Sequence, residues 1–88
     1  MEDAFRDFLK EEGYSEYTPS GNKSTVYDYS KRVNRICQWE NCTWEELVAR
    51  ITEIVQMYDV GGKKEDIGSK SNHAYINALR AFQRFVNK

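Results

Sequence analysis

The stretch SNHAYINALRAFQRFVNK, residues 71 to 88, carries polar side chains at helical spacing and contains no carboxylate. Four of these side chains follow one another at offsets of four, three and four residues, which places them on one stripe of a helix. Arginine binds phosphates or the edge of guanine, and asparagine bonds the edge of adenine. The stripe therefore has the chemistry of a nucleic-acid contact, and it consists of His73, Asn77, Arg80 and Arg84.

A second polar stripe is predicted on a helix that begins at Ser24 or just before it and ends near Glu40. The same projection turns Lys31, Asn34, Arg35 and Gln38 outward. One helix of this kind fits the major groove of duplex DNA, which is about 12 Å wide. The alternative for each stripe is a simply hydrated surface, which is the ordinary fate of an outward helix face. The presence of two such stripes in one small acidic protein favours a functional surface over a simply hydrated one.

Charge is unevenly distributed along the sequence. The net charge is −1, which argues against a strongly basic nucleic-acid binder. Residues 67–88, however, carry four bases and no acid, whereas residues 1–12 carry five acids against two bases and residues 42–66 carry six against three. Positive charge is thus concentrated in the last segment.

Helical periodicity and end signals predict four helices. The first covers EDAFRDFLKEE and ends at Gly13, and the second ends at Asn41. Thr43 and Glu46 have the spacing of a capping box, with Cys42 and Leu47 at the positions of a hydrophobic staple. These signals start a third helix that runs to about Tyr58, and a fourth helix begins near Ser69 or Ser71.

The expected core follows the apolar stripes of these helices. No segment alternates with the period of a strand, and 88 residues suit one domain, so residues 1–88 are predicted to form a single all-α, compact four-helix bundle. Residues 14–23 and the stretch DVGGKKEDIG are predicted loops. The inward residues are Ala4, Phe5, Phe8 and Leu9, then Val26, Tyr29, Val33 and Ile36, then Leu47, Ile51, Ile54, Val55 and Tyr58, and finally Tyr75, Ala78, Leu79, Phe82, Phe85 and Val86.

The sequence gives less support to metal binding, catalysis or base stacking. His73 is the only histidine, so no metal site or other cofactor is expected, and no nucleophile, base and orienting group can be named together for an enzyme. Trp39, Trp44 and the six tyrosines fit core or partly buried packing better than a base-stacking platform. The acidic N-terminus and the absence of a long apolar run predict a cytoplasmic protein with no membrane segment and with Cys37 and Cys42 reduced.

Three segments together resemble the N-terminal core-binding, or SAM-like, domain of tyrosine recombinases and phage integrases. The second helix has the run Thr25, Tyr29 and Val33, followed by Ile36 and Trp39. The third segment, LVARITEIVQMY, resembles that domain's short aliphatic helix ending in tyrosine, and ALRAFQRFV resembles its last helix. The resemblance covers roughly residues 3–87.

The resemblance implies a four-helix module that turns its second and fourth helices toward the major groove of duplex DNA. A separate, tethered catalytic domain would complete a clamp around the DNA, and self-association on DNA is compatible with this arrangement. The residues that match contact positions are Thr25, Lys31 and Arg35 on the second helix and Asn72, His73, Asn77, Arg80 and Arg84 on the fourth. For Arg80, a structural ion pair with another helix is the alternative.

Two departures from the family restrict the expected activity. The catalytic domain is absent from this sequence, so the chain is expected to be a piece of a longer protein that cannot cut or rejoin DNA by itself. Its net charge of −1 predicts weak binding in isolation, with affinity supplied by the tether. Two alternatives remain open: a helical protein-interaction module, and the N-terminal specificity domain of a restriction-type nuclease.

Overall fold

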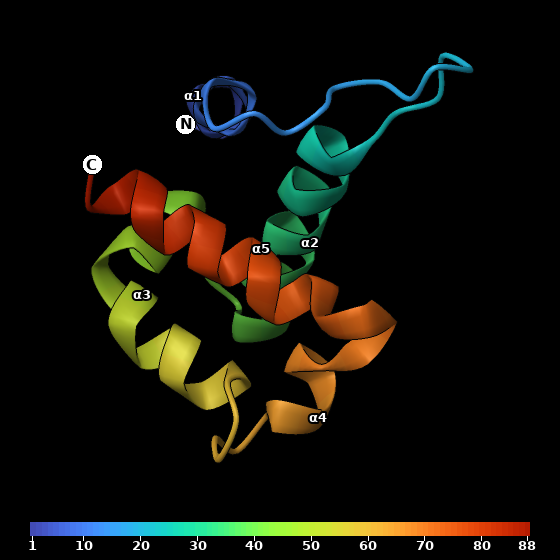
Figure 1. Cartoon of the computed structure of the whole chain (residues 1–88). Coiled ribbons are helices and arrows are strands. Elements are labelled where there is room, and N and C mark those ends of the chain that lie inside the picture. Colours follow the sequence, from blue (N-terminus) through green and yellow to red (C-terminus); the bar gives the residue numbers. More distant parts are fainter.

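The fold is all-α, as predicted, and it contains five helices and no strand (Figure 1). The computed structural model describes residues 1–88. The helices are α1 (Glu2–Glu11), α2 (Thr25–Glu40), α3 (Trp44–Tyr58), α4 (Glu65–Gly68) and α5 (Lys70–Val86). The four expected helices are α1, α2, α3 and α5, and α4 is an addition. None of the five is both long enough and apolar enough to cross a membrane.

The helix ends follow the local signals of the sequence. Thr43 accepts a hydrogen bond from the Glu46 backbone N–H at 3.1 Å, and the Glu46 carboxylate accepts one from the Thr43 N–H at 2.9 Å. The predicted capping box at the start of α3 is therefore confirmed. Asn41 ends α2 in the left-handed conformation with φ 54°, and the Cys42 N–H donates back to the Cys37 carbonyl at 3.0 Å.

α5 is the central helix of the fold and packs against each of the other four. In Figure 1 it lies across α2, with its first turns near α4 and its last turns near α1. The aromatic rings of Phe5, Phe82, Phe85 and Trp44 meet at the centre, with Phe5 and Phe82 centroids 5.2 Å apart in an edge-to-face arrangement. Most predicted inward residues are buried. Ala4 is an exception, because it is exposed on the outer side of α1.

The short helix α4 lies inside the segment 59–68 that was predicted as a loop. Its last residue is Gly68, which packs directly against the end of α3. A Cβ atom at Gly68 would lie 1.9 Å from the Tyr58 carbonyl oxygen, a distance that no side chain tolerates. The prediction of a loop holds for residues 59–64 and was wrong for residues 65–68, because the close contact between two helix ends is a tertiary effect, which helical periodicity does not report.

The start of α5 departs from the predicted helix register. Ser71, Asn72 and His73 have φ values of 55°, 61° and 66°, so the backbone makes one left-handed turn before the right-handed helix continues. Such a turn costs about 1 to 2 kcal/mol per non-glycine residue. The projection at 100° per residue therefore does not apply to His73, and its predicted place on the same stripe as Asn77, Arg80 and Arg84 was wrong.

Candidate nucleic-acid interface

The two arginines of the predicted α5 stripe both bind carboxylates of other elements. Arg80 donates to Asp59, directly after α3, at 2.7 Å. Arg84 donates from Nη2 and Nε to Glu12, directly after α1, at 3.0 and 3.3 Å. Lys88, at the end of the chain, pairs with Glu11 at 3.0 Å. Three of the four cations in the acid-free segment are thus paired within the molecule.

These ion pairs shift the pKa values of the groups involved. The hydrogen bond from Arg80, together with one from the Val60 backbone N–H, lowers the pKa of Asp59. The bond to Glu12 raises the pKa of Arg84, and the Tyr14 hydroxyl lies 3.3 Å from the same guanidinium group. For Arg80, the alternative of a structural ion pair is confirmed. Arg80 and Arg84 tie the outer side of α5 to the ends of α3 and α1.

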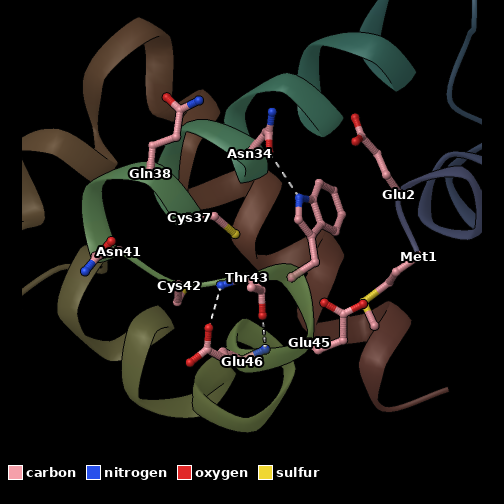
Figure 2. A pocket seen from close by; sticks show the side chains of 11 residues that line it. Met1, Glu2, Asn34, Cys37, Gln38, Asn41, Cys42, Thr43, Glu45 and Glu46 are labelled. Atoms are coloured by element: carbon pink, nitrogen blue, oxygen red, sulfur yellow. Dashed lines mark hydrogen bonds between the residues drawn. The ribbon is translucent and has the colours of Figure 1, made fainter.

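The outward stripe of α2 divides between two clefts. Asn34 and Gln38 line the wide cleft, a hollow of about 670 Å³ between the second half of α2, the start of α3 and the N-terminus (Figure 2). There the Asn34 carbonyl oxygen accepts a hydrogen bond from Trp44 Nε1 at 3.2 Å. Three carboxylates, Glu2, Glu45 and Glu46, line the same cleft. This mixture of amides and acids repels a polyanion.

Lys31 and Arg35 lie instead in a smaller cleft of about 250 Å³ between α2 and the first turns of α5. We call it the α2–α5 cleft; its lining consists of Asp28, Lys31, Arg32, Arg35, Ser71 and Tyr75. Arg32 is held in place by a hydrogen bond from Nε to Asp28 at 3.3 Å. Its guanidinium carbon also lies 4.7 Å from the ring centroid of Tyr75. Three cations against one carboxylate give this cleft a positive character.

Five cations of the molecule take part in no ion pair: Lys23, Lys31, Arg35, Lys63 and Lys70. Lys31 and Arg35 are the two that share a cleft, and both are exposed. An unpaired cation needs no internal partner to be displaced before it contacts a phosphate. The α2–α5 cleft is therefore the part of the molecule best suited to bind an anion.

The other predicted contact residues lie at different distances from this cleft. Asn72 and His73 are exposed and follow Ser71, a lining residue of the cleft, in the left-handed turn. Asn77 is exposed on α5 and forms no side-chain hydrogen bond within the chain. Thr25 is half-buried at the first position of α2, six residues before Lys31, which corresponds to about 9 Å along the helix axis.

Sequence reasoning missed Arg32, Ser71 and Tyr75 as parts of the cleft. A signal for Arg32 existed, because it lies four residues after Asp28 and three before Arg35, on the same side of a helix. Ser71 and Tyr75 join the cleft through the packing of α5 on α2, and no pattern local to either segment reports that packing. Comparison of the chain with protein-family models, curated proteins and solved structures gives no significant match.

Proposed function

We propose that this chain is a DNA-binding domain that holds duplex DNA against the outer side of α2 and the first turns of α5. The observation that carries the proposal is the α2–α5 cleft, in which the unpaired cations Lys31 and Arg35 lie on consecutive turns of one exposed helix face. Phosphate contacts from such cations supply most of the affinity of a DNA-binding protein and fix its position on the duplex.

The centre of the proposed contact differs from the one expected from the sequence. Arg80 and Arg84 would have to exchange their carboxylate partners for phosphates, whereas Lys31 and Arg35 would not. We therefore propose that Lys31 and Arg35 on α2 make the main phosphate contacts. Asn72, His73 and Asn77 are exposed polar groups close to the start of α5 and would make secondary contacts.

The finer proposal is that the chain is the core-binding, SAM-like four-helix module of an integrase or tyrosine recombinase. Its support is the run Thr25, Tyr29 and Val33 on α2 and the ALRAFQRFV run on α5. Such a module positions DNA for a tethered catalytic domain. Because the net charge is −1, the domain alone would bind weakly, and the tether would raise its effective concentration at the DNA.

The test is a fluorescence-anisotropy titration of labelled duplex DNA at low salt. Arg35→Ala should weaken binding by about three- to tenfold, since each phosphate contact that is removed lowers the electrostatic affinity. Lys63→Ala is the matched control, because it removes an exposed, unpaired cation from the loop after α3 and should leave the affinity nearly unchanged. Absence of binding, or equal effects of both substitutions, would remove the proposal.

A second candidate is a protein-interaction module, and the wide cleft favours it. Glu45 and Glu46 line that cleft together with the amides of Asn34 and Gln38, a combination suited to a basic peptide. Sedimentation analysis separates the two functions. Self-association or partner binding without any DNA affinity would support this module and contradict the first proposal.

A further inference from the structure

An exposed tryptophan contacts one of the residues that line the α2–α5 cleft. Trp39 retains 45% of its surface in contact with solvent, although tryptophan is among the most buried residue types on average. Its ring packs on Tyr75 with centroids 5.2 Å apart and an angle of 42° between the planes. Tyr75 also lines the cleft, so Trp39 contacts a lining residue of the cleft while part of its indole stays uncovered.

Arg32 and Trp39 approach Tyr75 from the same helix. They are seven residues apart on α2, which brings them to one face two turns from each other. Arg32 lies over the Tyr75 ring at 4.7 Å, and Trp39 packs against the same side chain. Tyr75 is buried by these contacts, so the indole of Trp39 is held on a fixed support.

Arg35 links this aromatic support to the cationic cleft. It lies four residues before Trp39 and four after Lys31, so the three side chains follow one another on successive turns of α2. The rise between them is about 6 Å per step. A cation next to an exposed aromatic ring matches the two parts of a nucleotide, whose phosphate is anionic and whose base has a flat π face.

We infer that the α2–α5 cleft binds an unpaired nucleotide of a DNA strand, with its base stacked on Trp39 and its flanking phosphates on Arg35 and Lys31. The inference rests on the proposed DNA-binding function and specifies its ligand further. In a fully paired duplex the bases are stacked on each other and offer no free face, so Trp39 would contribute little. A single-stranded tail, a gap or a displaced base would engage it.

The inference is tested with two probes, a blunt labelled duplex and the same duplex carrying an unpaired thymine tail. The tail should tighten binding and quench the tryptophan fluorescence. Trp39→Leu should weaken binding of the tailed duplex by about five- to one-hundredfold, the range that loss of one stacked base gives. The same substitution should weaken binding of the blunt duplex much less, because a paired base offers no free face to Trp39. Tyr17→Leu is the matched control, because Tyr17 is 52% exposed and belongs to the loop before α2.

A conservative variant separates stacking from folding. Trp39→Phe keeps an aromatic ring on Tyr75 and should retain part of the preference for the tailed duplex. Its fluorescence should not be quenched, because Trp44, the remaining tryptophan, is bonded to Asn34 in the wide cleft.

If the tail brings no gain in affinity, or if Trp39→Leu retains the full gain, the inference is wrong. Arg35-dependent binding of the blunt duplex would still leave the proposed function in place, whereas absence of binding to both probes would remove it.

Discussion

At the scale of single residues, Glu40 at the end of α2 is a strongly constrained charged group. Its side chain is 7% exposed and accepts hydrogen bonds from the Tyr58 hydroxyl at 2.8 Å and from Lys64. Burial alone would raise the pKa of Glu40, but the bonds from Lys64 and Tyr58 outweigh burial and lower it. The carboxylate joins the end of α2 to α3 and to the loop before α4, which fixes α2 relative to the rest of the bundle.

The lowered pKa of Glu40 predicts a defined pH dependence of stability. A carboxyl group whose pKa is lower in the folded chain stabilises the fold above its unfolded pKa, which is about 4.3, and this contribution is lost as the pH falls through the folded pKa. Glu40→Gln should therefore lower the free energy of unfolding by about 1 to 3 kcal/mol at pH 7. The difference from wild type should shrink toward pH 3.

Urea unfolding followed by circular dichroism at several pH values measures this difference. Glu53→Gln is the control, because Glu53 is a largely exposed partner of Arg50 at 3.6 Å, and its loss should change stability by less than about 0.5 kcal/mol. A Glu40→Gln effect that is the same at pH 7 and pH 3 would show that the charge of Glu40 is irrelevant.

The two cysteines differ in their predicted reactivity. Burial, with a smaller effect from the neighbouring Cys42, raises the pKa of Cys37 to about 12, so its thiol stays protonated at pH 8. Cys42 is half-buried and, like Cys37, borders the wide cleft (Figure 2). Because the thiolate is the nucleophile, iodoacetamide should modify Cys42 first in the folded protein. Mass spectrometry of the peptides checks this order, and equal rates for both cysteines without denaturant would contradict it.

At the scale of elements, the α2–α5 cleft depends on how α4 and the first turn of α5 are placed. α4 reaches the end of α3 through Gly68, and the left-handed turn from Ser71 to His73 then directs α5 across α2. Gly68 has no room for a side chain beside the Tyr58 carbonyl. The close contact at Gly68 thus holds the end of α4 three residues before Ser71, which lines the cleft.

Gly68→Ala should destabilise the fold by about 1 to 3 kcal/mol or more, since the added methyl group must push α4 away from the end of α3. Gly61→Ala is the comparison, because its Cβ would meet nothing within 4 Å and only its positive φ of 85° opposes the change, which costs about 1 kcal/mol. Urea unfolding of both variants measures the effects. If Gly68→Ala proves no more harmful than Gly61→Ala, the contact between α4 and α3 does not determine the fold.

The helices were predictable from the sequence because their signals are local. Thr43 and Glu46 lie three residues apart, and the apolar spacing of Tyr75, Leu79 and Phe82 reports one buried face. The candidate site was less predictable because its properties depend on distant residues. Nothing near Arg84 in the sequence indicates that Glu12 neutralises it, and this pair spans 72 positions.

The exposure of Trp39 was equally hidden from the sequence. A tryptophan in an amphipathic helix is ordinarily a core residue, and Trp39 does pack on Tyr75 with one part of its ring. Whether the rest is covered depends on how α5 crosses α2, which no pattern within α2 contains. The prediction of core or partly buried packing is confirmed by the contact with Tyr75, and 45% of the Trp39 surface remains exposed.

At the scale of the whole molecule, the segregation of charge along the sequence is largely cancelled in the fold. The acid-free helix α5 meets the acidic segments at Glu11, Glu12 and Asp59, and its C-terminal half is neutralised there. The net charge of −1 therefore understates the local charge of the α2–α5 cleft, where Lys31 and Arg35 remain unpaired. A nearly neutral protein can still present one cationic surface of limited extent.

The most direct test of this picture is the salt dependence of duplex affinity for two double variants of equal charge. Lys31→Ala/Arg35→Ala removes both unpaired cations of the cleft, and Lys23→Ala/Lys63→Ala removes two unpaired cations elsewhere. The slope of log affinity against log salt should become shallower by about two units for the first variant and stay unchanged for the second. Equal slopes for both variants would mean that DNA responds to net charge alone, which contradicts a binding site between α2 and α5.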